Sequence, residues 1–378
     1  MRNTFSLKTQ LVTSVTLALA LAFPSANVIA QQANSSITIY GRVDTSYIYQ
    51  SNRGAAGPQN VIGSGAFQPS QFGIKGSEDL GDGLKALFGL ETTILSDTGA
   101  LASSSRLFDR TAIVGLSSTR WGTLTIGRQV TPLAELFYAT DPLKAGNGAT
   151  NMNVRFGYLG GAGPKVAGNF GSDAAFASNS LDRQDNSVKY ALRGDSGLLA
   201  SAMLAFGESV GSTAASNAAG ALLGYDHGPL QLRGSAMQFH DTNGVAFDAF
   251  ALGAGFQISS TLMLKLTLTK NKILSGIAAY GNQTTRVYSS GLTWTAMPNL
   301  GITVAYYYGE RSSDGKDSQV ARKLYFIPEY KLSKRTAVYA LLDVEHFNAA
   351  GSQLDTGTPL AAGTSHSNYL AMGIGHNF

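Results

Sequence analysis

The sequence has no cysteine, only 10 prolines and 2 tryptophans among 378 residues, and charged residues make up only 14% of it. The absence of cysteine excludes disulfide bonds, thiolate metal sites and thiol catalysis. A typical soluble domain is about 25% charged, so charge is scarce here. The 28 basic and 24 acidic residues are mixed along the chain without a basic run. This dispersed pattern gives no sign of a nucleic-acid partner.

Glycine and two aromatic residues are abundant instead. The chain has 44 glycines, 16 tyrosines and 18 phenylalanines, and 44% of its residues are hydrophobic. This hydrophobic content excludes a disordered chain. These residue types favour a structure of many strands joined by tight turns rather than a helical structure.

The first residues have the anatomy of an export signal. A basic start (Arg2, Lys8) precedes the apolar stretch Leu11–Phe23, and a small-residue cleavage context follows. The apolar stretch is shorter than the roughly 20 residues that a membrane-spanning helix needs. We predict a signal peptide over residues 1–30 and one domain over residues 31–378.

Beyond this leader the hydrophobic pattern has a period of two residues. In the segment 261–270, four leucines at even positions alternate with Lys265, Thr267 and Thr269. Such alternation predicts a strand with one apolar and one polar face. No later segment has 18 uninterrupted apolar residues, so no helical span is expected.

The connections between these segments alternate in length. Short turns such as 81–83 and 259–260 alternate along the chain with longer polar connections such as 51–65 and 130–182. An even number of strands with all short turns on one side is typical of a closed outer-membrane barrel. Sixteen strands would leave an aqueous channel inside. A secreted β-sandwich also alternates, but it usually carries more charge.

We expect sixteen strands in an all-β, antiparallel transmembrane barrel. They are predicted near residues 36–50, 66–77, 83–95, 107–119, 121–129, 185–194, 197–208, 219–227, 229–241, 247–258, 261–273, 284–296, 299–311, 319–331, 335–348 and 366–378. Aromatic residues near strand ends are expected to form interface girdles. These are Tyr306, Tyr307, Tyr308, Phe326, Tyr330 and Tyr339.

Several segments resemble the general porins of β-proteobacteria, which are Gram-negative trimeric porins. The similar segments are the opening strand at 37–41, the hairpin Phe72–Ala86, Arg110–Leu116, Trp121–Gln129, Arg183–Tyr190 and the ending Gly373–Phe378. Together they span the whole domain after the leader. The resemblance implies a 16-stranded trimeric porin in the outer membrane, whose third loop (130–182) folds into the pore and constricts it.

In the family, wall arginines oppose acidic residues on this loop. Arg110 and Arg183 match two such wall positions, whereas Gln71 stands where relatives have a third arginine. We therefore expect a channel for passive diffusion of small hydrophilic solutes and ions, with at most a mild preference for anions. Further candidate pore-lining residues are Arg42, Lys75, Lys85, Arg128, Glu135 and Asp141.

The resemblance also implies partners. Phe378 resembles the assembly signal that the barrel-assembly machinery reads, and the other expected partners are outer-membrane lipid and two further copies in a homotrimer. No cofactor, metal site or nucleic-acid partner is expected.

The alternative is an outer-membrane barrel hydrolase. Gly207–Gly211 matches a nucleophile-elbow pattern, but that motif needs an α/β sheet, which this pattern does not predict. His346 lies near Asp343 and Glu345 in sequence, yet adjacent residues of a strand point to opposite faces. We therefore expect a channel and no enzyme.

Overall fold

The computed structural model describes most of the chain after the leader. The described residues are 35–52, 57–146, 151–153, 170–171, 182–212, 214–273, 282–314, 317–348 and 364–378. The predicted signal peptide lies outside these ranges.

Seventeen strands and one helix make up the described structure. The strands are β1 (Ser36–Gln50), β2 (Gln59–Ser64), β3 (Gln71–Gly81), β4 (Leu84–Thr93), β5 (Thr111–Ser118), β6 (Gly122–Val130), β7 (Arg183–Arg193), β8 (Leu198–Ala205), β9 (Ala218–His227), β10 (Leu230–His240), β11 (Ala246–Ser259), β12 (Leu262–Ile273), β13 (Gln283–Met297), β14 (Leu300–Ser313), β15 (Gln319–Lys331), β16 (Thr336–Phe347) and β17 (His366–Asn377). The helix is α2 (Pro132–Thr140). Within the described residues, no helix has the length and apolar content needed to span a bilayer.

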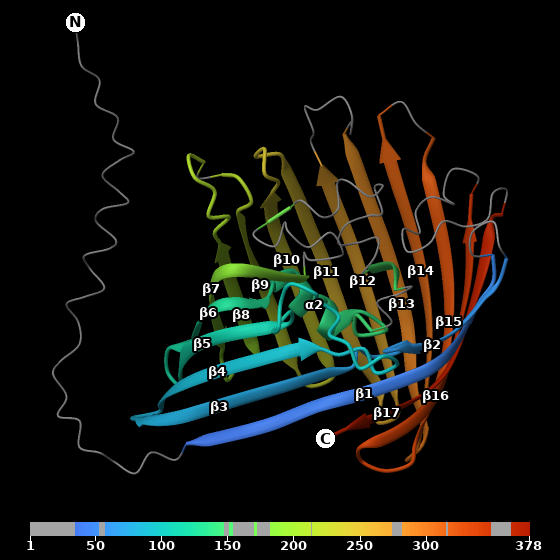
Figure 1. Cartoon of the computed structure of the whole chain (residues 1–378), viewed down its shortest axis with the longest axis horizontal. Coiled ribbons are helices and arrows are strands. Elements are labelled where there is room, and N and C mark those ends of the chain that lie inside the picture. Colours follow the sequence, from blue (N-terminus) through green and yellow to red (C-terminus); the bar gives the residue numbers. More distant parts are fainter. Residues whose placement is uncertain are drawn as a thin grey trace, which may run out of the picture.

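All strands pair antiparallel with their neighbours, and β17 pairs with β1 to close the ring (Figure 1). β2 and β3 share one partner, because β2 pairs with the second half of β1 and β3 with its first half. Counted as one interrupted strand, they leave the sixteen strands of the expected barrel. The predicted fold class is therefore confirmed.

The two faces of the barrel wall follow the predicted alternation. In β12, Leu266 is 43% exposed and Thr267 only 4%. The hydroxyl of Thr267 donates to the carbonyl of Thr140 in α2 at 3.0 Å, which shows that Thr267 points inward. Leu266 and its even-numbered neighbours therefore face outward, toward the hydrocarbon that a membrane barrel meets.

Two details differ from the expectations. The predicted loop 51–65 contains the short strand β2, which forms a hairpin with β1 despite its polar and glycine-rich flanks. Tyr307 and Tyr339 do not belong to an outer girdle, because both are buried and both donate hydrogen bonds to carboxylates inside the barrel. Tyr307 alternates with the outward-facing Tyr306 and Tyr308, so strand geometry alone directs it inward.

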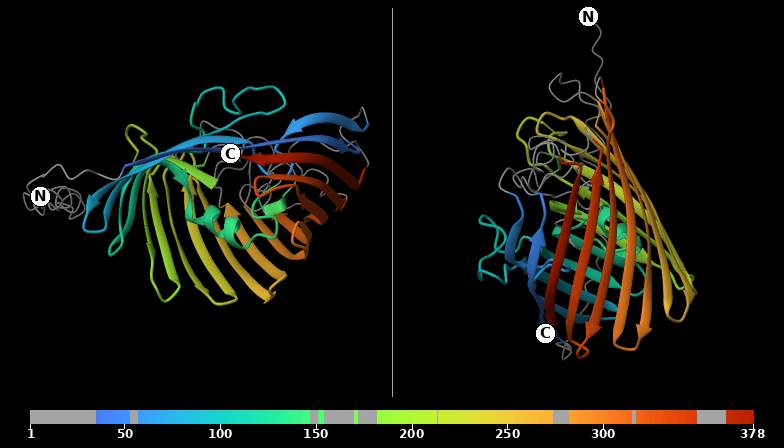
Figure 2. Two further views of the ribbon diagram at one scale, coloured as in Figure 1. Left: turned by 90° about the horizontal axis from the view of Figure 1, so that it is seen from below. Right: turned by 90° about the vertical axis from the view of Figure 1, so that its right-hand side faces the viewer.

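The helix α2 lies inside the barrel, against the inner surface of β8 to β12 (Figure 2). Thr131 caps its start by accepting a 3.2 Å hydrogen bond from the amide of Ala134, and Pro132 occupies the first turn. Leu133, Leu136 and Phe137 are fully buried against the wall. This apolar stripe has helical spacing, so burying it holds the first part of the long third loop in the lumen.

Candidate functional site

The loop is fixed to the wall where α2 ends. The carboxylate of Asp141 accepts hydrogen bonds from the hydroxyl of Tyr307 at 2.9 Å and from the side-chain amide of Asn153 at 2.7 Å. It also accepts from the side-chain amide of Asn151 and the backbone amides of Leu143 and Ala145. Asp141 is fully buried. The residue expected to present a charge to the pore water thus anchors the loop instead.

Glu135, unlike the buried Asp141, is partly exposed and forms an ion pair with a lysine of the barrel wall. It lies in the first turn of α2, where a negative charge is favourable, and remains 32% exposed. Its carboxylate accepts from the ammonium of Lys189 at 2.7 Å and from the hydroxyl of Ser201 at 2.6 Å. Glu135 therefore faces wall strands β7 and β8 with a paired charge.

The other end of α2 meets a wall lysine. The ammonium of Lys265 on β12 donates to the carbonyl of Ala139 at 2.6 Å. A cation suits this position, because the last carbonyls of a helix carry partial negative charge. Lys265 and Glu135 thus hold the two ends of the helix against the wall by opposite charges.

Arg110 lies within a polar cluster on β1, β3 and β4. Its Nε donates to one oxygen of Glu91 at 2.5 Å, and the hydroxyl of Tyr40 donates to the other at 2.9 Å. The ammonium of Lys75 lies 5.0 Å from the centre of the Tyr40 ring. Within the described part of the chain, Lys75 forms no ion pair, so it is a net positive charge on the inner wall.

Arg183 links β7 to the helix. Its guanidinium forms an ion pair with the adjacent Asp182, and it donates to the hydroxyl of Tyr138 on α2 at 3.3 Å. Arg183 itself is 8% exposed.

The remaining candidate cations differ in their surroundings. Arg42 donates to Asp44 at 2.9 Å, and Asp44 also accepts from Tyr339 at 2.6 Å. Lys85 is exposed near the short turn between β3 and β4, on the same face of β4 as Glu91.

Arg128 lies beside a bulge that interrupts the alternation of β6. Its guanidinium bonds Asp185 at 2.8 Å and the carbonyl of Asp109 at 2.5 Å. Asp185 also accepts from Arg106 at 2.5 Å. These contacts form a network of side chains at the corner where β6 leads into the loop.

The structure thus brings the candidate arginines together with acids that the sequence did not single out. All four arginines named from the sequence have a carboxylate partner: Arg42 with Asp44, Arg110 with Glu91, Arg128 with Asp185, and Arg183 with Asp182. Lys189 and Lys265 are further cations that sequence analysis missed. Both lysines alternate in sequence with apolar residues, which places them on the polar face of their strands. This alternation could have identified them as candidates.

Comparison with known proteins agrees with this architecture. Residues 15–350 match the family model described as Gram-negative porin. The chain belongs to the family of Gram-negative porins. It is therefore an outer-membrane channel protein, and the predicted family, function and location are confirmed.

Two curated relatives and one solved structure show the extent of the similarity. The chain is 29% identical to outer membrane porin protein 32 of Delftia acidovorans over 321 residues, which cover 83% of this porin and 84% of that protein. It is 37% identical to an outer membrane porin protein of Bordetella pertussis over 142 residues, which cover 33% of this chain and 36% of the relative. An anion-selective porin from Comamonas acidovorans superimposes with a TM-score of 0.75 at 25% identity, covering 91% of this chain and all of that one.

The residues behind the hydrolase alternative are not assembled into a site. His346 faces outward from β16, whereas Asp343 and Glu345 point inward. The hydroxyl of Ser209 donates to the carbonyl of Gly207 in its own loop. The family and the fold indicate a channel rather than an enzyme. In the described ranges, no group of three His, Asp or Glu side chains is placed to hold a metal ion.

Proposed function

We propose that this porin is a passive diffusion channel with a weak preference for anions, constricted by the segment of the third loop that contains α2. The observation that carries the proposal is the pairing of the wall arginines. A guanidinium whose charge is balanced by a neighbouring carboxylate adds little net field to the pore. Lys75 and Lys85, which lack such a partner among the described residues, would supply the remaining positive potential.

The charge distribution around α2 supports a weak rather than a strong preference. Arg110 and Arg183 add positive charge, but Glu91 and Asp182 lie against them. The position where similar porins carry a third arginine holds the neutral Gln71. The similar porin from Comamonas acidovorans is described as anion-selective, which agrees in sign with this proposal.

Recording from the purified protein in planar bilayers tests this function. We expect stepwise, ohmic conductance that grows with salt concentration, and a small reversal potential in a salt gradient with the sign of anion preference. A cation-selective reversal potential would contradict the proposed selectivity. The absence of conductance from heat-modifiable, inserted protein would contradict an open pore.

We further propose that the porin assembles as a homotrimer and that the barrel-assembly machinery reads its C-terminal strand. Met372, Ile374 and Phe378 face outward on one stripe, with exposed fractions of 52%, 48% and 43%. The backbone of Phe378 pairs with Gly41 at the seam of the barrel, where Phe378 N donates to the Gly41 carbonyl at 3.1 Å. Chemical cross-linking of protein in native membranes tests the oligomer, with a ladder that ends at three subunits as the expected result.

A further inference from the structure

The chain between β2 and β3 turns into the barrel instead of continuing along the wall. Gly65 has a left-handed backbone (φ 69°), and its amide donates to the carbonyl of Asp44 at 2.8 Å. A Cβ atom at this glycine would lie 3.0 Å from the carbonyl oxygen of Gln68, so the turn requires glycine. Ala66, the next residue, is only 3% exposed. We call residues 65–70 the inward segment.

The buried Asp44 of β1 holds the inward segment by its backbone. Its carboxylate accepts hydrogen bonds from Arg42 at 2.9 Å, from Tyr339 of β16 at 2.6 Å and from the backbone amide of Gln68. The hydroxyl of Ser70 accepts from the amide of Asp44 at 2.9 Å and donates to its carbonyl at 3.0 Å. Since a buried polar network is stable only while its members are paired, these contacts fix the position of the inward segment.

The inward segment also packs against the third loop. The rings of Phe67 and Tyr339 lie 5.4 Å apart, which places Phe67 against the inner wall. Ala66 and Phe67 belong to one apolar cluster with Leu143 and Met152 of the third loop. The wall, the inward segment and the end of the third loop therefore share one core.

The inward segment and the third loop meet most closely at Gly146. A Cβ atom on this glycine would lie 2.8 Å from the carbonyl oxygen of Phe67 and 2.5 Å from the side-chain nitrogen of Gln68. A larger residue would therefore displace the backbone of the inward segment. The absence of a side chain lets the end of the third loop lie directly on the inward segment.

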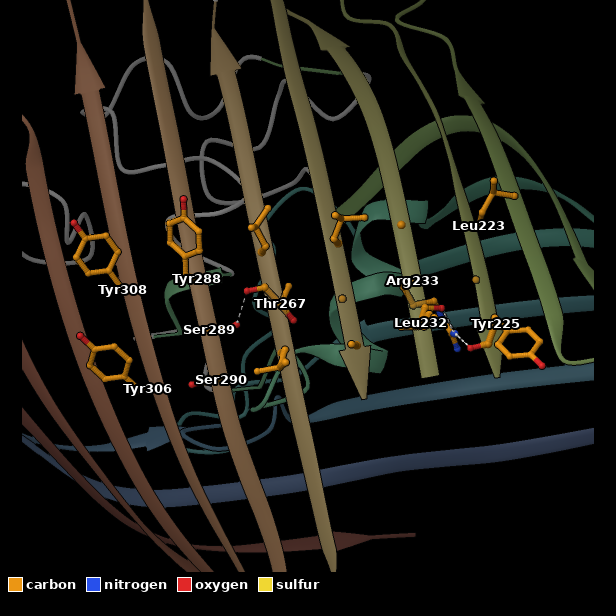
Figure 3. Close-up of a pocket in the computed structure, with 17 residues that line it drawn as sticks. Leu223, Tyr225, Leu232, Arg233, Thr267, Tyr288, Ser289, Ser290, Tyr306 and Tyr308 are labelled. Carbon is orange, nitrogen blue, oxygen red and sulfur yellow. Dashed lines mark hydrogen bonds between the residues drawn. The ribbon is translucent and has the colours of Figure 1, made fainter. Parts of the chain in front are cut away.

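The other side of this loop end is attached to the wall. The side-chain amide of Asn153 donates to the hydroxyl of Ser289 on β13 at 3.0 Å. That hydroxyl donates to the carbonyl of Thr267 on β12 at 3.4 Å, and Figure 3 shows the two residues adjacent on their strands. The loop end therefore extends from β12 and β13 to the inward segment, which is itself held by β1 and β16.

Together these two parts of the chain cover one side of the lumen. Tyr307, Tyr325 and Leu341 point inward from β14, β15 and β16, yet all three are fully buried. The helix α2 covers the inner surface of β8 to β12 in the same way. Lys75 on β3, in contrast, remains exposed on the inner wall. The accessible part of the wall at this height is thus the part that carries Lys75.

We propose that the inward segment is a second constriction element of the pore. It closes the gap between the end of the third loop and the wall at β1 and β16, so that solutes pass between the third loop and strands β3 to β5. Phe67 sets the width of the passage on this side, because its ring fills the space next to Tyr339. The inference rests on the proposed diffusion channel and adds to its constriction a part of the chain outside the third loop.

Single-channel recording of Phe67→Ala in planar bilayers, with heat-modifiable protein, tests the proposal. We expect a conductance at least a fifth above that of the unaltered porin, and entry of larger polyethylene glycols into the pore. Phe326→Ala removes the same ring from the outer face of β15 and should leave both measurements unchanged. An equal or lower conductance in Phe67→Ala would overturn the second constriction alone. An unaltered porin without conductance would overturn the diffusion channel and this inference together.

A variant of the third loop tests the same contact from its other side. Gly146→Ala places a methyl group against the backbone of the inward segment and should also raise the conductance. Gly301→Ala is the control, because nothing lies within 4 Å of that position. Since both substitutions act on one contact, Phe67→Ala/Gly146→Ala should show less than the sum of the single effects. Additive effects, or an unchanged conductance in Gly146→Ala, would overturn the proposal.

Discussion

The hydroxyl of Tyr307 donates a 2.9 Å hydrogen bond to the carboxylate of Asp141, joining residues 166 positions apart. Tyr307 belongs to wall strand β14, and Asp141 follows the helix that lies in the lumen. Both residues are fully buried. This contact fixes the end of α2 to the side of the barrel, in addition to the buried apolar face of α2 and its contacts with Lys189 and Lys265.

Removal of the Tyr307 hydroxyl should loosen the loop. Tyr307→Phe leaves one lone pair of the buried Asp141 carboxylate without its donor, which costs about 1–3 kcal/mol. We expect more frequent current fluctuations in single-channel recordings, with the barrel still heat-modifiable. Tyr306→Phe, which alters the outward-facing neighbour, is the control. Equally quiet traces from both variants would show that the contact does not restrain the loop.

Gly41 and Phe378 define a tight seam. A Cβ atom on Gly41 would meet the ring of Phe378 and would lie 2.5 Å from the carbonyl oxygen of Gln71. Gly41→Ala should lower stability by roughly 1–3 kcal/mol, as overpacking does, and reduce the heat-modifiable fraction on gels. Gly301→Ala is the matched control, because nothing lies within 4 Å of that position. Equal heat-modifiable fractions in the two variants would argue against a packed seam.

Deletion of Phe378 should reduce the amount of inserted barrel in cells. The residue closes the seam with two backbone hydrogen bonds to Gly41 and extends the outward stripe of β17. Quantifying heat-modifiable porin in outer-membrane fractions checks this outcome. Insertion at the level of the intact chain would reject the role of the terminal aromatic residue in assembly.

Neutralising either member of the ion pair between Glu135 and Lys189 should change the ion selectivity, and the two changes should have opposite signs. Glu135→Gln leaves the Lys189 ammonium unbalanced and should raise the anion-to-cation permeability ratio. Lys189→Gln leaves Glu135 unbalanced and should lower it. Reversal potentials at low salt measure both, since screening weakens such fields as ionic strength rises. A shift of the same sign in both variants would contradict the account.

Most of the fold can be predicted from the sequence, because a membrane barrel forces apolar and polar residues to alternate. The leucines at 262–268 and the alternating loop lengths are enough to predict the strands and their order. The strand β2 is not predictable in this way, since its stability comes from pairing with β1 and not from its own pattern. The prediction that Tyr307 belongs to a girdle is wrong because it relies on the number of aromatic residues near strand ends. The position of Tyr307 in the alternation of its strand is the better indicator of its direction.

The site is less predictable, because its partners come from distant strands. Arg110 and Arg183 are identifiable through resemblance, but no local pattern shows that Glu91 lies against Arg110. That contact depends on the register between β4 and β5. The burial of Asp141 is not predictable for the same reason, because its main partner on the wall, Tyr307, lies far along the chain.

The reversal potential of Arg110→Gln/Arg183→Gln in a salt gradient at low ionic strength tests the central claim most directly. Both guanidiniums are permanently charged, and their removal leaves Glu91 and Asp182 as uncompensated negative charges near α2. Arg322→Gln, on the outer face of β15, is the control and should keep the parent's ratio. We predict that the double variant has a lower anion-to-cation permeability ratio than the parent. A ratio equal to that of the parent would contradict the claim that Arg110 and Arg183 offset the charges of Glu91 and Asp182 in the pore.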